Sequence, residues 1–237
     1  MKNWLRSIEY SKDKWHLYIL FLSAPVLLTL YRYEGTASRL AGYFGIHDFN
    51  NSTRQNTFYI YQHLFFFCFL FLLPVFYLLF FRQESLRDYG FLMGDWKSGF
   101  KIVLFSIPII VLISYLSSNQ LDFRAEYPLA KSLISHHEYI LPFELAYIIF
   151  YYIAWEFFFR GFILFGLKAE LGAVSAVLIQ TISSCLVHIG KPESEIFSSM
   201  LAGIIFGAIA LRTKSFWYTF IIHALLGVSL DLFIIFK

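Results

Sequence analysis

The sequence predicts an all-α, polytopic bundle of transmembrane helices with about seven spans, on the basis of its composition and its long apolar runs. Of the 237 residues, 58% are hydrophobic and 15% are charged, and the mean hydropathy is +0.62. A soluble domain carries about 25% charged residues. Aromatic residues make up 21% of the chain and gather in runs such as 63–81, which would promote aggregation in water. We therefore expect lipid to surround most of the protein.

The apolar runs are long enough to cross a bilayer, which takes about 20 residues. Seven runs qualify or nearly do, and the fifth and sixth are short, as tilted or broken helices would be. No small-residue cleavage site follows the first run, so it is expected to remain as a helix. We treat residues 1–237 as a single membrane domain. The predicted spans are 15–31, 57–81, 100–118, 141–167, 173–189, 196–211 and 216–236.

The charged residues predict the partners and the orientation. The net charge of +3 is small and the basic residues are spread between the apolar runs, which favours membrane lipid and argues against nucleic acid as a partner. With seven spans, eleven Lys and Arg residues lie on the side of the N-terminus and seven on the other side. Because Lys and Arg are more frequent in cytoplasmic loops, the N-terminus is predicted to be cytoplasmic. Cys68 and Cys185 stand inside apolar runs, so no disulfide framework or Cys-based zinc site is expected.

Ionisable side chains inside the predicted spans are the most informative positions of the sequence. Each costs about 2.5–3.5 kcal/mol to insert, so such residues usually face the interior of a bundle and have a function. The fourth span, the end of the fifth and the seventh contain Glu144, Glu156, Arg160, His188, His223 and Asp231. His63 stands alone in the second span, where a hydrogen bond between helices is the expected role.

Glu156 and Arg160 are four residues apart, so they share a helix face and can pair. An ion pair that only neutralises both charges is one interpretation. His188 and His223 favour another, because imidazole is suited to proton transfer or metal binding near neutral pH. If both histidines meet Glu156 in a water-accessible cavity, the group forms a hydrolytic site. Glu156 would then activate water, and a histidine would stabilise the oxyanion.

These residues resemble the motif series of the CAAX-protease and bacteriocin-processing (CPBP) family of intramembrane proteases. That family has a Glu-Glu-x-x-x-Arg motif, a Phe-x-x-x-His motif and a His-x-x-x-Asn motif on successive helices. The resemblance covers residues 141–237, which it makes the motif-bearing catalytic half. It implies an intramembrane endopeptidase whose catalytic residues are Glu156, Arg160, His188 and His223.

The form Trp-Glu-Phe-Phe-Phe-Arg-Gly at residues 155–161 is similar to the first motif of a bacterial subgroup linked to processing of C-terminal sorting signals on surface proteins. The resemblance therefore implies a bacterial cell membrane and a membrane-anchored protein or peptide that is cut near its C-terminus. The need for a metal stays open. Glu156, His188 and His223 would be able to bind zinc with an open position, or to act without metal as a glutamate-type protease. We favour the second alternative, in which no cofactor is required.

Three positions depart from the family motifs. The second Glu, the Phe before the first His and the final Asn are replaced by Phe157, Ser184 and Gly227. The water-activating Glu is retained, whereas the change at Gly227 removes a polar group that would hold the oxyanion. Asp231 and Ser229 are near enough in sequence to supply one, or to form a polar patch at the helix end. The hydroxyl of Ser184 is expected to orient His188 from one turn away.

Two other classes of function compete with a protease. A catalytically inactive membrane scaffold or an immunity-type protein of the same fold is favoured by Phe157 and Gly227. A transporter is less favoured, because few charges stand in the spans and no pair of interrupted helices is visible.

Two features outside the motifs have structural interpretations. The polar segment 188–195 contains Lys191, Glu193 and Glu195, which we interpret as a solvated turn with a carboxylate at the start of a helix. Gly203 and Gly207 form a Gly-x-x-x-Gly pair, which predicts close packing of two helices rather than chemistry.

Overall fold

The computed structural model describes residues 14–46, 48–49 and 51–237. These residues form helices joined by turns, with no strand among them, so the predicted all-α class is confirmed. Six helices among these residues are long and apolar enough to cross a membrane, and the shorter apolar helix Ala173–Leu186 stands at the fifth predicted span. The protein is an integral membrane helical bundle of about seven spans. Lys2, Arg6 and Lys12, which contribute to the predicted orientation, lie outside the described residues.

The elements follow one another as α-helical segments with short π-helical and 3-10 segments between them. The first half has α2 (Trp15–Glu34), α3 (Ala37–Tyr43), α4 (Ser52–Phe67), η2 (Cys68–Leu72), α5 (Leu73–Phe76), η3 (Tyr77–Arg82), η4 (Leu86–Tyr89), α6 (Trp96–Ser117) and α7 (Leu121–Glu126). The second half has η5 (Lys131–Ile134), η6 (His137–Tyr139), α8 (Ile140–Ala146), η7 (Tyr147–Tyr152), α9 (Ile153–Glu156), η8 (Phe157–Ile163), α10 (Leu164–Leu171), α11 (Ala173–Leu186), α12 (Glu193–Thr213) and α13 (Trp217–Ile235). Two of the spans are composite helices, Ser52–Arg82 and His137–Leu171.

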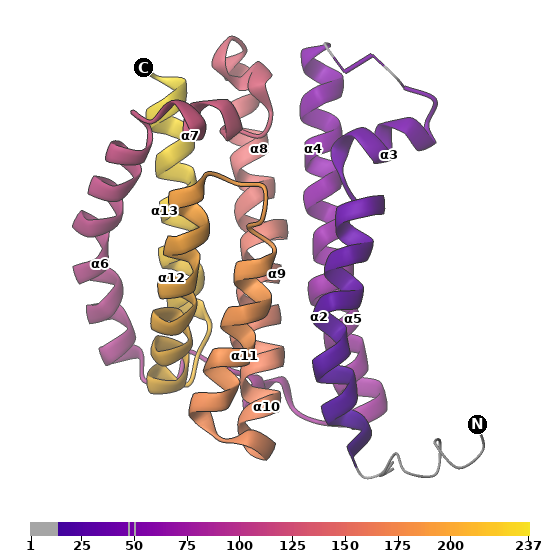
Figure 1. Ribbon diagram of the computed structural model, residues 1–237, viewed down its shortest axis with the longest axis vertical. Helices are drawn as coiled ribbons and strands as arrows, with labels where there is room; N and C mark the ends of the chain where they lie inside the picture. Colours follow the sequence, from indigo (N-terminus) through magenta and orange to yellow (C-terminus); the bar gives the residue numbers. More distant parts are fainter. Residues whose placement is uncertain (1–13, 47, 50) are drawn as a thin grey trace.

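The motif-bearing helices lie at the centre of the bundle (Figure 1). α6 stands at one edge and α2 with α4 at the other, while the long helix His137–Leu171 runs between them. In its apolar window 67% of the residues are buried, whereas in that of Trp15–Glu34 only 11% are buried. The charged residues of the fourth span are therefore enclosed by protein, which is where charges inside a membrane are tolerated.

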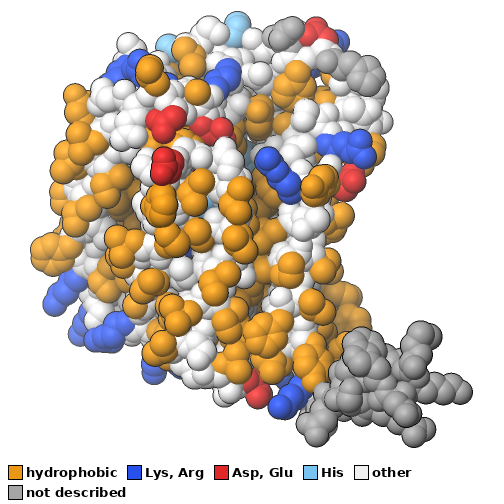
Figure 2. Space-filling view, viewed as in Figure 1, with side chains coloured by type: hydrophobic (Ala, Val, Ile, Leu, Met, Phe, Trp, Pro, Cys, Tyr) orange, Lys and Arg blue, Asp and Glu red, His pale blue; other side chains and the backbone are white. Residues whose placement is uncertain are grey.

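The outer surface has the pattern of a membrane protein. Figure 2 shows hydrophobic side chains over the middle of the visible face and charged side chains mainly toward its upper and lower parts. α6 exposes a row of large apolar side chains that includes Phe105, Leu112 and Leu116. Such a row is unfavourable in water, so it is expected to face lipid. α2 begins at one end of the bundle and α13 ends at the other, as an odd number of passes requires.

The predicted glycine pair lies where α11 and α12 approach each other. A Cβ at Gly203 would lie 2.8 Å from the side chain of Thr181, and one at Gly207 would lie 3.0 Å from Gln180 Nε2. Gln180 Nε2 also donates a 2.8 Å hydrogen bond to the carbonyl oxygen of Gly203. The prediction that Gly203 and Gly207 serve helix packing is confirmed, and this contact holds α11 close to α12.

Candidate active site

Glu156 lies at the end of α9, within the long central helix, and its side chain is fully buried. The π-helical segments η7 and η8 come directly before and after α9, and such segments are frequent at functional sites. Arg160 Nη1 lies 3.4 Å from Glu156 Oε1, so the predicted pairing is observed. The Arg160 guanidinium lies 5.8 Å and 5.4 Å from the ring centres of Phe159 and Phe206, a cation–π arrangement. Its positive charge offsets part of the cost of burying an ionised carboxylate.

His223, on α13, contacts the same carboxylate. Its Nδ1 lies 2.7 Å from Glu156 Oε1. Because an ionised carboxylate only accepts hydrogen bonds, Nδ1 is the donor, and Nε2 of the neutral ring then has a free lone pair. The side chain of His223 is 20% exposed, whereas that of Glu156 is 0% exposed. The imidazole rather than the carboxylate is therefore the exposed part of this pair.

Phe157 stands where the family motif has its second Glu. It is fully buried and packs against the rings of Phe71 and Phe216, at 4.9 Å and 5.6 Å between ring centres. This side chain fills an apolar contact between helices. The departure at Phe157 therefore leaves the contacts of Glu156 intact.

His188 lies in the turn after α11. Its Nδ1 lies 2.8 Å from the carbonyl oxygen of Ser184, and it must be the donor because a carbonyl oxygen only accepts. The Ser184 hydroxyl donates instead to the carbonyl oxygen of Thr181, at 3.2 Å. The expectation that this hydroxyl orients His188 is therefore wrong, and the backbone of the same residue does so. The indole of Trp155 lies 5.4 Å from the ring of His188 and 5.9 Å from that of His223, so both histidines border one side chain.

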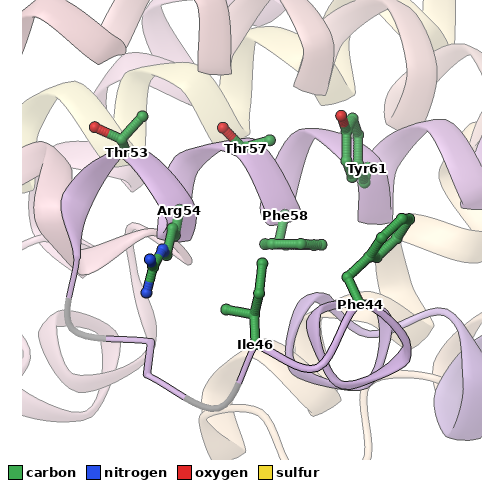
Figure 3. Close-up of a pocket in the computed structure, with 7 residues that line it drawn as sticks. All are labelled: Phe44, Ile46, Thr53, Arg54, Thr57, Phe58 and Tyr61. Carbon is green, nitrogen blue, oxygen red and sulfur yellow. The ribbon is translucent and has the colours of Figure 1, made fainter.

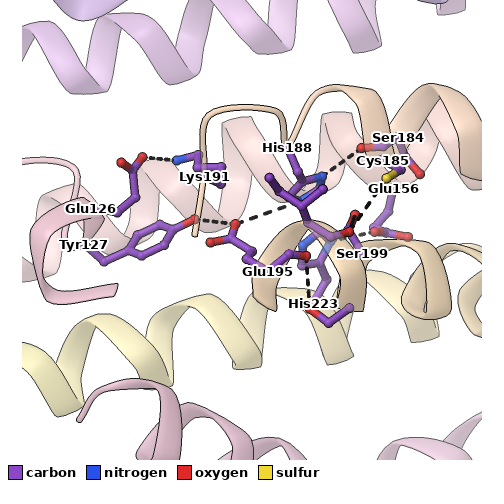
Figure 4. Close-up of polar contacts among 12 residues, drawn as sticks. Glu126, Tyr127, Glu156, Ser184, Cys185, His188, Lys191, Glu195, Ser199 and His223 are labelled. Atoms are coloured by element: carbon purple, nitrogen blue, oxygen red, sulfur yellow. Dashed lines mark hydrogen bonds and ion pairs between the residues drawn. The ribbon is translucent and has the colours of Figure 1, made fainter. Parts of the chain in front are cut away.

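Glu195, in the first turn of α12, is tied into the protein. Its Oε1 accepts a 2.7 Å hydrogen bond from the Tyr127 hydroxyl and lies 4.0 Å from His188 Nε2. Burial and the neighbouring Glu195 charge raise the pKa of Tyr127 well above its ordinary value, so its hydroxyl keeps its proton. Lys191 pairs with Glu126 and lies over the Tyr127 ring (Figure 4). Glu195 stands in the first turn of α12, as the interpretation of a carboxylate at the start of a helix predicted, whereas the contacts of Lys191 and Glu195 leave both side chains partly buried rather than fully solvated.

Two polar residues of the spans are engaged elsewhere. His63 is fully buried, and neither of its ring nitrogens has a hydrogen-bond partner among the described residues. It stacks on Tyr147 with 4.7 Å between ring centres, so the expected hydrogen bond between helices is wrong. Asp231 is buried near Glu144 of α8, and neither carboxylate has a hydrogen-bond partner among the described residues. The Asp231 carboxylate thus belongs to a second buried polar group further along α13.

The three proposed metal ligands do not share a binding point in this conformation. Among the described residues, no group of three or more His, Cys, Asp or Glu side chains is placed to hold a metal ion. Glu156 and His223 bind each other directly, and the charged neighbour of His188 Nε2 is Glu195. Zinc requires lone pairs that are directed at one point, and this arrangement does not fit that requirement.

Two pockets lie away from the contact between Glu156 and His223. One, of about 290 Å³, lies beside α4 and is lined mainly by apolar and aromatic side chains (Figure 3). The other, of about 380 Å³, lies between the start of α7 and the start of α12. Its lining residues are Gln120, Asp122, Glu193, Ser194 and Phe197.

Residues 137–229 match the family model of the type II CAAX prenyl endopeptidase Rce1-like proteins. The matched segment is Rce1-like. It contains Glu156, Arg160, His188 and His223, and it confirms the likeness to the CPBP family over this part of the chain. Neither the curated proteins nor the solved structures gave a match. The family match supports a membrane endopeptidase in general.

The sequence did not single out two tyrosines that border the Rce1-like motif residues. Tyr127 binds Glu195, and the Tyr152 hydroxyl lies 1.7 Å from the point that a Cβ on Gly227 would occupy. A signal for Tyr152 was present, because the glycine that replaces the motif Asn makes room for a side chain from another helix. Glu193, in contrast, is exposed as expected.

Proposed function

We propose that the protein is an intramembrane endopeptidase that cleaves a membrane-anchored protein or peptide near its C-terminus. The observation that carries the proposal is the contact of Glu156 with both His223 and Arg160 inside the Rce1-like segment. A structural ion pair needs only two opposite charges. A carboxylate that also holds an imidazole in one orientation is the arrangement with which hydrolases take a proton from a nucleophile.

Glu156 and His223 act as one base. The Arg160 charge favours ionised Glu156, which holds His223 with its proton on Nδ1 and leaves Nε2 free. Nε2 accepts a proton from water while the water oxygen bonds to the scissile carbonyl carbon. Glu156 stabilises the imidazolium that forms. The imidazolium then returns the proton to the leaving nitrogen as the carbon–nitrogen bond breaks, so that Glu156 activates water through His223.

His188 orients the attacking water. Its Nδ1 is held by the Ser184 carbonyl, so Nε2 of the neutral ring accepts the second hydrogen of the same water. The position of both imidazoles beside Trp155 supports this shared role. The Glu195 carboxylate, 4.0 Å from Nε2, stabilises the His188 ring whenever that ring becomes positively charged.

The proposed setting is a bacterial cell membrane with a cytoplasmic N-terminus, which the bias of basic residues supports. The turn between α11 and α12, which carries His188, lies toward the end of the bundle opposite the start of α2 (Figure 1). With that orientation, substrate approaches the candidate site from the outer side of the membrane.

Turnover of a membrane-anchored reporter by Glu156→Gln and wild-type protein tests the proposal at matched expression. Gln keeps the size of Glu and still accepts a hydrogen bond from His223 Nδ1, but its neutral amide does not stabilise a protonated His223. We expect turnover to fall by about 10²- to 10⁴-fold, the usual contribution of a general base. His63→Phe is the matched control, because it removes a membrane histidine and keeps an aromatic ring beside Tyr147. It should retain most activity.

Wild-type turnover by a folded Glu156→Gln protein would show that Glu156 is not part of the catalytic group. Absence of turnover by the wild type on a broad panel of membrane-anchored substrates would favour the second candidate, the inactive scaffold. The departures from the motif at Phe157 and Gly227 are the observations that favour that candidate.

A further inference from the structure

Tyr152 and Gly227 interlock one helical turn away from the contact between Glu156 and His223. Tyr152 precedes Glu156 by four residues on the central helix, and Gly227 follows His223 by four residues on α13. A Cβ on Gly227 would lie 1.7 Å from the Tyr152 hydroxyl oxygen and 2.7 Å from Cζ of the same ring. A side chain at Gly227 is thus incompatible with Tyr152 in this position.

The ring of Tyr152 also contacts the proposed base. Its centre lies 4.9 Å from that of the His223 imidazole, and the side chain is 97% buried, since only 3% of its surface is exposed. Tyr152 is therefore fixed on two sides, by His223 along the ring and by Gly227 at the hydroxyl. The hydroxyl is a hydrogen-bond donor placed one turn from the base.

The hydrolysis needs such a donor, because the carbonyl oxygen becomes negatively charged when water adds to the carbonyl carbon. The Nδ1 protons of the two histidines are already donated to Glu156 and to Ser184, and both Nε2 atoms accept in the neutral rings. Arg160 lies one turn beyond Glu156 on the side opposite to Tyr152, against aromatic rings. Neither the histidines nor Arg160 thus offers a donor on the Gly227 side of the base.

We propose that Tyr152 is a further catalytic residue, whose hydroxyl donates a hydrogen bond to the carbonyl oxygen of the scissile peptide as that oxygen becomes negative. The proposal rests on the proposed function. The hydroxyl keeps its proton throughout, and no bond to Tyr152 forms or breaks. Gly227 has no side chain, so the Tyr152 hydroxyl occupies the space beside it. A donor from the central helix thus stands where the family motif places a side chain on α13.

Tyr152→Phe tests this role, because it removes the hydroxyl and keeps the ring that packs on His223. We expect kcat to fall by about 10²- to 10³-fold with little change in KM, as when one oxyanion donor is removed. Tyr151→Phe is the matched control, since it removes the hydroxyl of the adjacent tyrosine, whose ring lies 5.5 Å from that of Tyr152. It should keep wild-type turnover. If the Tyr152 hydroxyl served packing alone, Tyr152→Phe would change the melting temperature and leave kcat intact.

An exchange of the two positions gives a second, independent test. Gly227→Asn alone should be inactive, because its Cβ meets the Tyr152 hydroxyl. The double variant Tyr152→Ala/Gly227→Asn should recover at least tenfold over Gly227→Asn, since an amide donor then enters the vacated space. Undiminished kcat in Tyr152→Phe would overturn the inference while Glu156→Gln remains inactive, which leaves the proposed function standing. Absence of turnover by the wild type would overturn both.

Discussion

His223 and His188 border the same indole ring, but they are held by different kinds of structure. His223 stands on a membrane-spanning helix and its Nδ1 is bound by a buried carboxylate, which in turn is paired with Arg160. His188 stands in a turn, its Nδ1 is bound by a backbone carbonyl, and its charged neighbour Glu195 is 18% exposed (Figure 4). One histidine is thus fixed by the core of the bundle and the other by contacts at its end.

Because of this difference, the two histidines are expected to respond differently to substitutions around them. The contacts of His223 depend on charges that are costly to bury, so they are expected to be sensitive to the loss of either partner. The contacts of His188 connect it through Glu195 to Tyr127, in the segment that follows α7. Changes at Tyr127 or Glu195, which together with His188 we call the entrance side of the site, can therefore reach His188 without disturbing the buried pair.

The largest effects are expected from removing the histidines themselves. His223→Ala and His188→Ala should each lower turnover by about 10²- to 10⁴-fold. Combining either with Glu156→Gln should add almost nothing, because groups that act as one unit are not additive. The comparison predicts that the two variants differ in stability. His223→Ala removes the hydrogen bond of a buried carboxylate and should lower the melting temperature more than His188→Ala.

The measurements are reporter turnover for the single and double variants and thermal unfolding of each purified protein in detergent. Multiplicative losses in the double variants would show that the histidines and Glu156 act in separate steps. Equal melting temperatures for the two Ala variants would remove the distinction between a core histidine and an entrance histidine.

The sequence predicted the part of this arrangement that local rules determine. Hydropathy located the spans, because lipid demands about 20 apolar residues in a row, and the spacing of Glu156 and Arg160 predicted their pairing. The choice of His223 as the partner of Glu156 depends on how α13 packs against the central helix, which no local pattern encodes. The contacts of Glu195 were missed, because a polar segment next to a span looks solvated until the segment after α7 packs on it.

Arg160→Ala should destabilise the protein around the buried pair of Glu156 and His223. It leaves the Glu156 carboxylate buried without its cation, which costs about 3 to 5 kcal/mol when one partner of a buried pair is removed. Thermal unfolding in detergent measures this loss. Arg212→Ala is the matched control, because Arg212 forms a 2.9 Å ion pair with Asp95 but its side chain is 66% exposed. Exposed pairs contribute little to stability, so its melting temperature should stay near that of the wild type. Equal melting temperatures for Arg160→Ala and the wild type would contradict the buried pair.

Tyr127→Phe should have a smaller effect, on the entrance side. It removes the hydroxyl that holds Glu195 beside His188, a hydrogen bond of about 1 kcal/mol, so we expect turnover to fall roughly fivefold. Tyr43→Phe is the control, since it removes another hydrogen bond from tyrosine to glutamate, the exposed bond of Tyr43 to Glu34. Turnover should be unchanged there. A loss as large as that of His188→Ala would mean that Tyr127 itself contacts the substrate.

The smallest effect is expected from removing metal ions, and it decides whether the two histidines are independent at all. A zinc ion bound by Glu156, His188 and His223 would join the two regions and would have to displace the hydrogen bond between Glu156 and His223. The side chains do not fit such a site in this conformation, so turnover after prolonged dialysis against a strong chelator should equal that of the untreated protein. Added zinc should then give no stimulation.

Melting curves before and after dialysis provide a readout besides activity, because a bound metal stabilises the folded state by mass action. Loss of turnover and of thermal stability on dialysis, both restored by zinc alone, would show that one ion holds both histidines and that the separation of core and entrance is wrong.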